Sequence, residues 1–235
     1  VQMHAEQGCY VPELIFGHLL TSGNYNDSEK KVTGGRNGYG AKLTNIFSTK
    51  FVVETADGSA GRKFEQAFGK NMTERHEPLI SDHAGPGYTR VTFWPDLERF
   101  GMQSLSDDIV SLMKKRVYDV AGSTRGLCRV MLNGSRVPVF GFQDYVNLYS
   151  VDCGESDEQD APPVIYERCS DRWEVAVRII EGGFQQVSLV NNVCTTKGGT
   201  HVTLVVEQLV EAILKAARSK NRGGIEIKPS YVKSH

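Results

Sequence analysis

The chain of 235 residues carries 27 Lys and Arg against 28 Asp and Glu, which gives a net charge of −1, and 40% of its residues are hydrophobic. This composition is ordinary for a globular protein and excludes disorder throughout, while the balanced charge argues neither for nor against a nucleic-acid partner. Because no run reaches the roughly 18 apolar residues of a membrane span, we expect no membrane partner.

The cysteines are odd in number, widely scattered and free of C-x-x-C spacing. This usage favours buried thiols in a reducing compartment over a disulfide framework or a zinc site, and therefore an intracellular protein. The N-terminus has neither signal-peptide nor transit-peptide composition. The chain starts without methionine, as we expect of an excised or incomplete fragment. The cysteines are Cys9, Cys128, Cys153, Cys169 and Cys194.

The first predicted element is a short helix that begins at Pro12, because proline fits the first turn of a helix. Its predicted apolar face consists of Leu14, Ile15, His18 and Leu19. We interpret His18 as a residue at the edge of the core. The helix should end before residues 21–24, and the polar segment 24–31 has no apolar period, which predicts a loop.

The loop leads into the glycine box, residues 32–42, which read VTGGRNGYGAK and precede a helix-like segment from Leu43. Glycine lets a ligand approach the backbone closely, so a glycine-rich loop before a helix can direct several N–H groups at one phosphate, to which Lys42 would add a charge. A P-loop is excluded because Ala41 separates Gly40 from Lys42. The dinucleotide fingerprint is excluded because the spacing here, G-x-x-G-x-G, is reversed. From the glycines alone, a structural loop that serves only turns and packing would be preferred.

Two strands, around residues 51–55 and 63–68, are predicted to pair as a hairpin through a tight turn. Residues 71–87 lack periodicity and predict a loop, after which the alternation over 88–93 predicts another strand. The two histidines of this loop lack H-E-x-x-H spacing, so we interpret them as solvated side chains and not as metal ligands.

Ser106 precedes two acidic residues and predicts the N-cap of a helix that faces a core. Its apolar positions are Ile109, Leu112, Met113, Val117 and Val120. Asn133-Gly134 between two short strands predicts a second hairpin. The acidic segment 152–163 predicts a solvent-exposed loop, in preference to an acidic mimic of DNA.

Residues 173–179 alternate and residues 184–190 follow a glycine turn, which predicts a third hairpin. The polar loop 191–201 then leads into a helix. The predicted apolar face of this helix is Val202, Val205, Val206, Leu209, Ile213 and Ala216.

The C-terminal stretch is basic, since residues 212–235 contain six Lys or Arg and one Glu. Such charges can simply complement a helix end and solvate it, and composition alone favours that interpretation over a nucleic-acid contact.

The glycine box closely resembles the ATP-lid glycine box of eukaryotic-type type IIA DNA topoisomerases, and segments along nearly the whole chain resemble the same family. These segments are 10–22, 29–31, 46–51, 121–123, 183–186 and 195–199. The family belongs to the GHKL (Bergerat-type) ATPase superfamily. The resemblance implies an α/β fold of α+β two-layer sandwiches, with a partial GHKL ATPase domain over residues 1–140. A partial transducer domain of ribosomal S5 domain 2-like fold would follow over residues 141–235.

The resemblance also implies which residues bind ligands. The implied ATP contacts are Ser22, Gly23, Asn24, Gly35, Arg36, Asn37, Gly38, Tyr39, Gly40, Ala41 and Lys42. Gly23 departs from the usual serine, so a side-chain hydroxyl bond is lost at that position. The implied contacts to double-stranded DNA are Arg218, Lys220 and Arg222, through phosphates and without base reading.

The resemblance places the catalytic machinery outside the chain. In the family, the general-base glutamate, the magnesium-binding asparagine and the adenine-reading aspartate lie upstream of the matched residues, and the lysine that senses the γ-phosphate lies downstream. ATP and Mg²⁺ are thus the implied cofactors, but we expect neither catalytic residues nor metal ligands in this chain, and no ATP hydrolysis by it alone.

The expected parent is a nuclear homodimer that passes one DNA duplex through a transient double-strand break. Two alternative functions are also compatible with the sequence. One is another GHKL-superfamily ATPase, such as a chaperone or kinase. The other is a non-enzymatic, basic nucleic-acid-binding or dimerisation module in which the glycine loop is structural.

Overall fold

The computed structural model describes residues 1–29, 33–151, 163–180, 183–220 and 227–234. The chain divides into two compact units, Val1–Asp107 and Asp108–His235, which are described separately. The predicted acidic loop at 152–162, the turn at 181–182 and Arg222 lie outside the described residues.

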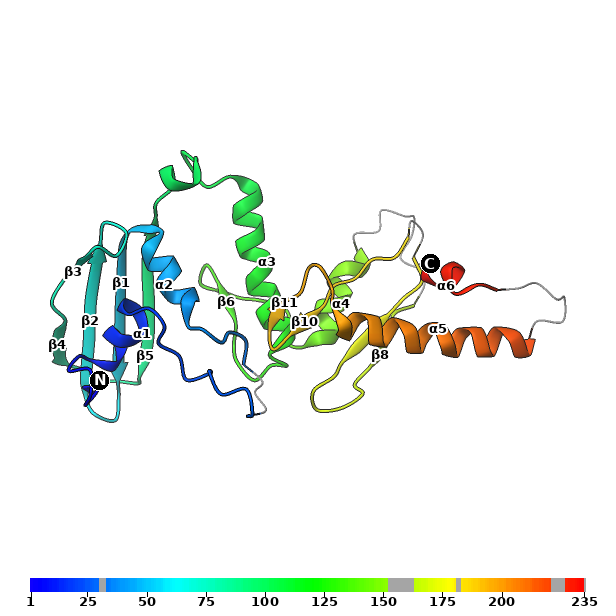
Figure 1. Cartoon of the computed structure of the whole chain (residues 1–235), viewed down its shortest axis with the longest axis horizontal. Coiled ribbons are helices and arrows are strands. Elements are labelled where there is room, and N and C mark those ends of the chain that lie inside the picture. Colours follow the sequence, from blue (N-terminus) through cyan, green and yellow to red (C-terminus); the bar gives the residue numbers. More distant parts are fainter. Residues whose placement is uncertain (30–32, 152–162, 181–182, 221–226, 235) are drawn as a thin grey trace. The chain divides into compact units, whose positions relative to one another are not determined.

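The first unit is built on an antiparallel sheet with the strand order β3-β2-β1-β5, and β4 also pairs with β2. The strands are β1 (Ser48–Asp57), β2 (Arg62–Gly69), β3 (Glu74–Arg75), β4 (Leu79–Asp82) and β5 (Tyr88–Pro95). Two helices, α1 (Val11–Gly17) and α2 (Tyr39–Ile46), pack on the sheet (Figure 1). A single 3₁₀ turn, η1 (Glu98–Phe100), follows β5. The predicted helix near Pro12, the first hairpin and the strand over 88–93 are confirmed.

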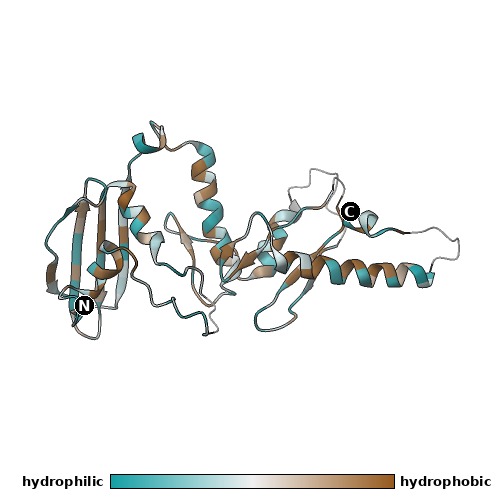
Figure 2. Cartoon of the chain, in the orientation of Figure 1, coloured by the Kyte–Doolittle hydropathy of each residue, from teal (hydrophilic) through white to brown (hydrophobic). Residues whose placement is uncertain are grey.

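The core of this unit follows from the strand register. Phe51 on β1 lies opposite Phe68 on β2, and Thr55 lies opposite Phe64. Because side chains alternate between the faces of a strand, these aromatic groups share one face with Val53. Phe51, Val53 and Phe64 are 0% exposed, and α1 covers them with Phe16. Figure 2 shows hydrophobic residues along these central strands.

The expectation of an irregular loop over residues 71–87 is wrong, because this segment contains β3 and β4. Both strands pair with β2 through their backbones, and most of their side chains are exposed or half-buried. A strand that buries little apolar surface produces no alternation, so the pattern could not reveal it.

β5 ends the strand order of the described sheet, and its side chains are mostly exposed. Val91, Phe93 and Trp94 are between 42% and 46% exposed. Lys50 on β1 places its ammonium 5.0 Å from the centre of the Trp94 ring.

The second unit consists of helices and two-stranded sheets (Figure 1). Its helices are α3 (Asp107–Ser123), α4 (Phe142–Val151), α5 (Thr200–Lys220) and α6 (Pro229–Lys233). The paired strands are β6 (Met131–Leu132) with β7 (Ser135–Arg136), β8 (Ile165–Glu167) with β9 (Val175–Val177), and β10 (Leu189–Val190) with β11 (Val193–Cys194). The helix predicted after Ser106, the helix predicted after the loop 191–201 and the hairpin at Asn133-Gly134 are confirmed. The last helix begins at Thr200, inside the predicted loop.

The third predicted hairpin is wrong. Residues 175–177 form β9 and pair with β8, not with residues 184–190. Leu189 and Val190 instead pair with β11 across a two-residue turn, in which Asn191 and Asn192 have φ of 50° and 64°. Positive φ at both central residues is the geometry of a type I′ hairpin, and asparagine tolerates it.

The two long helices bury partly different faces from those predicted. On α3, Leu112 and Met113 are 66% and 47% exposed, whereas Ala121 is 2% exposed. On α5, Val210 and Leu214 are the buried positions, whereas Ile213 is 47% exposed and Ala216 is also exposed. In both helices the buried face follows the neighbours that the fold supplies, which periodicity alone does not specify.

The cysteines differ from the expectation of buried thiols. Cys128 and Cys169 are exposed, and Cys9 and Cys194 are half-buried free thiols. Cys153 lies outside the described residues. In the described part of the chain, no helix is both long and apolar enough to cross a membrane.

Candidate phosphate-binding site

The glycine box forms the start of α2. Gly38 is the N-cap residue in the left-handed conformation, and Tyr39 begins the helix. The helix thus starts before the predicted Leu43, and Tyr39 to Lys42 form its first turn. The N–H groups of a first turn have no partner within the helix and carry the positive end of its dipole, so they can receive an anion.

Gly38 and Gly40 are glycine for different reasons. Gly38 has φ of 67°, and a Cβ there would lie 2.2 Å from the carbonyl oxygen of Thr21. A Cβ on Gly40 would meet no atom of the described chain within 4 Å, and its φ is not positive. Gly38 is therefore required by the fold, whereas no contact of the chain itself requires glycine at position 40.

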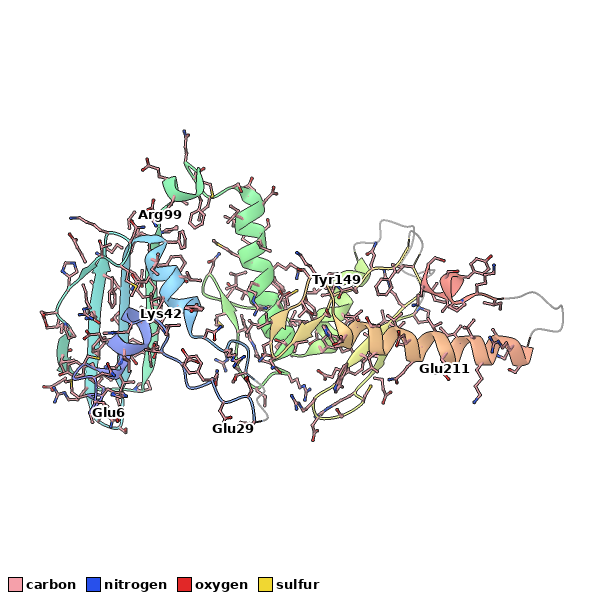
Figure 3. The ribbon with its side chains drawn as sticks, viewed as in Figure 1. Glu6, Glu29, Lys42, Arg99, Tyr149 and Glu211 are labelled. Carbon is pink, nitrogen blue, oxygen red and sulfur yellow. The ribbon has the colours of Figure 1, made fainter. Side chains whose placement is uncertain are left out.

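Lys42 is a buried cation. The residue, labelled in Figure 3, is only 2% exposed. Its Nζ donates a hydrogen bond to the carbonyl oxygen of Thr21 at 3.0 Å. Among the described residues, no carboxylate forms an ion pair with it. Burial lowers the pKa of Lys42, because removal from water disfavours the charged form. A buried ammonium without a counter-charge is costly, so the site is suited to receive an anion.

The segment before the box folds back onto it. Ser22 Oγ accepts a hydrogen bond from the Asn24 N–H at 3.1 Å, and Asn24 Nδ2 donates to the Gly35 carbonyl at 3.3 Å. The Tyr25 hydroxyl donates to the Asn37 carbonyl at 3.4 Å. The structure thus brings the candidate residues Ser22 and Asn24 together with the box. Asn24 and Tyr25 are at least eleven positions away in sequence from the box residues that they contact.

Other candidates in the box are turned toward solvent. Arg36 forms an ion pair with Asp27 at 2.7 Å, in which both side chains are at least 60% exposed. Such a pair contributes little to stability, so Arg36 is available to exchange its partner. Tyr39 is 42% exposed. Gly23, which lies before the box, is also open, since a Cβ there would meet nothing within 4 Å.

Two residues missed by the sequence interpretation hold the site in place. The hydroxyl of Thr21 lies 3.0 Å from the Leu14 carbonyl and 3.1 Å from the His18 carbonyl, which ties the site to α1. Asn45 is 1% exposed and donates from Nδ2 to the Phe16 carbonyl at 3.2 Å. Asn45 is a polar residue inside an otherwise amphipathic segment, and that could have marked it as a bridge between the two helices.

The box does not offer a magnesium site. Mg²⁺ requires oxygen ligands in near-octahedral geometry. Among the described residues, the one group of three potential ligand atoms consists of Cys9, Glu13 and His18, whose sulfur and nitrogen donors do not suit Mg²⁺. The described residues therefore fit a phosphate but not its metal ion.

The basic residues assigned to DNA lie at the end of α5. Arg218 and Lys220 are in the last turn of the helix and are both exposed. Among the described residues, neither forms an ion pair. Their position also complements the negative end of the helix dipole, so geometry alone fits either interpretation.

Comparison with known proteins gives one family match and several close relatives. The profile of the DNA gyrase B family matches residues 141–235. A protein of Bombyx mori named DNA topoisomerase 2 is 54% identical over 237 residues, which span 100% of this chain and 15% of that protein. The chain therefore covers only a small part of the length of such relatives.

Two solved structures resemble the whole chain. The ATPase region of Saccharomyces cerevisiae topoisomerase II is 46% identical, has a TM-score of 0.88, and is matched over 100% of this chain and 58% of its own. The ATPase and transducer domains of topoisomerase II from Balamuthia mandrillaris are 45% identical, with a TM-score of 0.88, over 100% of this chain and 59% of theirs. The predicted α/β fold class is confirmed by these neighbours.

Proposed function

Since this chain belongs to the eukaryotic DNA topoisomerase II family, we propose that it supplies the ATP lid and much of the transducer of an ATP-dependent enzyme. That enzyme would pass one DNA duplex through a transient double-strand break in another. The Bombyx mori relative shares 54% identity with the chain over its full length. The activity would belong to the longer protein, because the described residues do not contain the machinery for hydrolysis.

One observation carries the proposal for the lid. Lys42 is a nearly fully buried ammonium at the first turn of a helix, and no carboxylate neutralises it among the described residues. A phosphate of ATP would supply the missing negative charge and would accept hydrogen bonds from the N–H groups around Gly40. The side chain and the helix dipole would then act on the same anion.

We assign residues 1–140 to the ATPase domain and residues 141–235 to the transducer. The match to DNA gyrase B begins at residue 141, and the similar structure from Balamuthia mandrillaris comprises an ATPase domain and a transducer domain. The compact units divide earlier, at residue 107. On our assignment, α3 and the hairpin of β6 and β7 would belong to the ATPase domain in sequence but pack with the second unit.

The remaining partners follow from the proposed activity. Double-stranded DNA would contact the phosphate-binding residues Arg218 and Lys220, together with Arg222. Mg²⁺ would accompany the ATP phosphates, and its protein ligands would come from residues other than those described. We further propose that the enzyme is a homodimer in the nucleus, where duplex DNA is its substrate.

The substitution Gly40→Ala in the intact protein tests the lid. Because no atom of the described chain lies within 4 Å of a Cβ at this position, the melting temperature should be unchanged or slightly raised, alanine being about 1 kcal/mol better than glycine inside a helix. ATP-dependent strand passage should be lost, while ATP-independent DNA cleavage should persist. Gly141→Ala is a control for an open glycine outside the proposed site, because a Cβ there would also meet nothing within 4 Å in the described chain.

A normally folded Gly40→Ala protein with wild-type ATP turnover would show that ATP does not require glycine at this position, and the lid assignment would be wrong. If the protein also bound DNA without any response to ATP, a non-enzymatic nucleic-acid-binding module would be the better description.

A further inference from the structure

A thiol, a carboxylate and an imidazole converge around α1, outside the phosphate site. One ligand atom from each of Cys9, Glu13 and His18 lies within 4.8 Å of the other two. We propose that these three side chains bind a thiophilic divalent cation of the Zn²⁺ class, with water as the fourth ligand. The proposal does not rest on the proposed ATP lid.

The backbone holds the three residues in place. An antiparallel β-bridge joins Met3 to Tyr10, which is the N-cap residue of α1. Cys9 lies between the two bridged residues, directly before Tyr10. Glu13 lies in the first turn of α1, and His18 is its C-cap residue. Cys9 lies outside the helix, four positions before Glu13, and its sulfur lies within 4.8 Å of the Glu13 ligand atom. His18 joins them after the chain leaves the helix in an extended conformation.

The donor set and spacing suit zinc. Zn²⁺ binds sulfur, imidazole nitrogen and carboxylate oxygen at about 2.0–2.3 Å, which in a tetrahedron puts ligand atoms about 3.3–3.8 Å apart. His18 Nε2 and Glu13 Oε1 are already 3.8 Å apart. A contraction of about 1.5 Å at most would complete the geometry. Mg²⁺ and Ca²⁺ would reject the thiolate. Glu13 is 9% exposed, so its carboxylate is held and shielded from bulk water.

Arg75 on β3 occupies the position of the cation. Its Nη1 lies 2.9 Å from Glu13 Oε1 and 3.0 Å from His18 Nε2. Because arginine has only donors, His18 must accept this bond, and its lone pair therefore points into the cluster. The Arg75 side chain is 48% exposed and can swing into solvent. The cluster is already arranged to hold a positive group, which at present is a guanidinium.

The exchange conserves charge. When the divalent cation enters, the Cys9 thiol releases its proton to solvent and the sulfur forms a bond to the metal. The thiolate and the Glu13 carboxylate together neutralise the two positive charges. Arg75 leaves the cluster as the metal arrives, so it is a competitor of the metal.

The site adjoins the phosphate site through the backbone. The Thr21 hydroxyl lies 3.1 Å from the His18 carbonyl, and the Thr21 carbonyl accepts the hydrogen bond from Lys42. A cation that fixes His18 would therefore restrain the segment on which Lys42 is anchored.

Cobalt(II) titration of the 235-residue chain tests the proposal, because Co²⁺ takes zinc sites and reports a thiolate ligand by a near-ultraviolet charge-transfer band. The wild-type chain should develop the band, and Zn²⁺ should abolish it by competition. Cys9→Ser should lose it. His18→Gln should weaken the affinity at least about tenfold, since loss of even an outer partner of a metal site costs about 10- to 100-fold. Arg75→Gln should tighten binding, because it removes the competing cation.

The exposed thiols provide a matched control. A variant with both Cys128→Ser and Cys169→Ser should keep the band, and circular dichroism of each metal-free variant should match the wild type. If Cys9→Ser is unfolded, the opposite responses of His18→Gln and Arg75→Gln decide the question. The proposal is overturned if the wild type gives no band, if the band follows Cys128 and Cys169, or if Arg75→Gln weakens binding as His18→Gln does.

Discussion

At the scale of single residues, the site combines groups required by the fold with groups that the fold leaves unsatisfied. Gly38 belongs to the first kind, because a side chain would collide with Thr21. Lys42 belongs to the second kind, because it is charged and buried but has only a carbonyl as its described partner. The second kind marks a site for a ligand, since folding alone would favour an apolar residue there.

Lys42→Met should separate binding from stability. Replacing a buried charge by an apolar group of similar length is neutral or stabilising, against about 1 kcal/mol for the lost hydrogen bond to Thr21. We expect the free energy of unfolding to change by about 1 kcal/mol or less, while ATP affinity of the intact protein falls by an order of magnitude or more. Denaturant unfolding and nucleotide titration check this, with the exposed Lys50→Met as the control. A strongly destabilised variant would show that Lys42 is structural.

Tyr145 offers a pH-dependent prediction in the second unit. Its hydroxyl donates to Asp119 at 2.6 Å, and both residues are 2% exposed. Burial, together with the hydrogen bond to Asp119, raises the pKa of Tyr145 far above its usual value near 10. The folded state therefore retains this proton where the unfolded chain loses it, so the contribution to stability is complete below about pH 10 and declines above it.

Tyr145→Phe should cost about 1–3 kcal/mol at neutral pH, because Asp119 loses a donor while it stays buried. The alkaline decline that depends on this hydroxyl should also disappear. Urea unfolding near neutral pH and above about pH 10 measures both effects. Tyr231→Phe, at an exposed tyrosine, should show neither of them. Equal alkaline slopes in the wild type and Tyr145→Phe would contradict the assignment.

At the scale of elements, the sequence predicted helices and hairpins where the burial of one face places apolar residues at regular intervals. The β1–β2 hairpin was predictable because its inward positions are aromatic or aliphatic, and α5 because its apolar positions recur at helical spacing. Pairing between distant strands was not predictable, since alternation over 173–179 identifies a strand without identifying β8 as its partner. The glycine box was predictable from its composition, but the contribution of Thr21 was not. Its role depends on a backbone carbonyl that comes within reach of Lys42 only in the folded chain.

The basic end of α5 should bind DNA through phosphates alone. Replacing Arg218, Lys220 and Arg222 by alanine in the intact protein should weaken binding equally for unrelated duplexes. The log–log salt slope should flatten by about 0.9 for each phosphate that these side chains no longer neutralise. DNA affinity measured across a salt series decides this, with folding checked by circular dichroism. If the wild type and the triple variant had the same DNA affinity and the same salt slope, these charges would only complement the helix end.

At the scale of the whole molecule, we expect the chain to supply a phosphate-binding element without the means of hydrolysis. Hydrolysis requires a base within hydrogen-bond reach of the attacking water. Of the carboxylates in the segment before the box, Asp27 is paired with Arg36, and Glu29 accepts a hydrogen bond from Asn26. We therefore expect the described residues to hold the nucleotide without supplying the base for its hydrolysis.

The 235-residue chain alone should therefore show no ATP turnover above buffer in a steady-state assay. The intact protein, assayed in parallel, should turn ATP over. Turnover by the chain that survives rigorous purification and disappears in Lys42→Met would contradict this prediction.

The exposed strand β5 has a practical consequence for such experiments. A strand at the edge of a sheet offers its backbone to other chains, and natural proteins usually protect such edges with charges or a covering element. β5 instead presents Val91, Phe93 and Trp94 to solvent. We therefore expect the isolated chain to precipitate as its concentration rises, and Val91→Lys to improve its solubility.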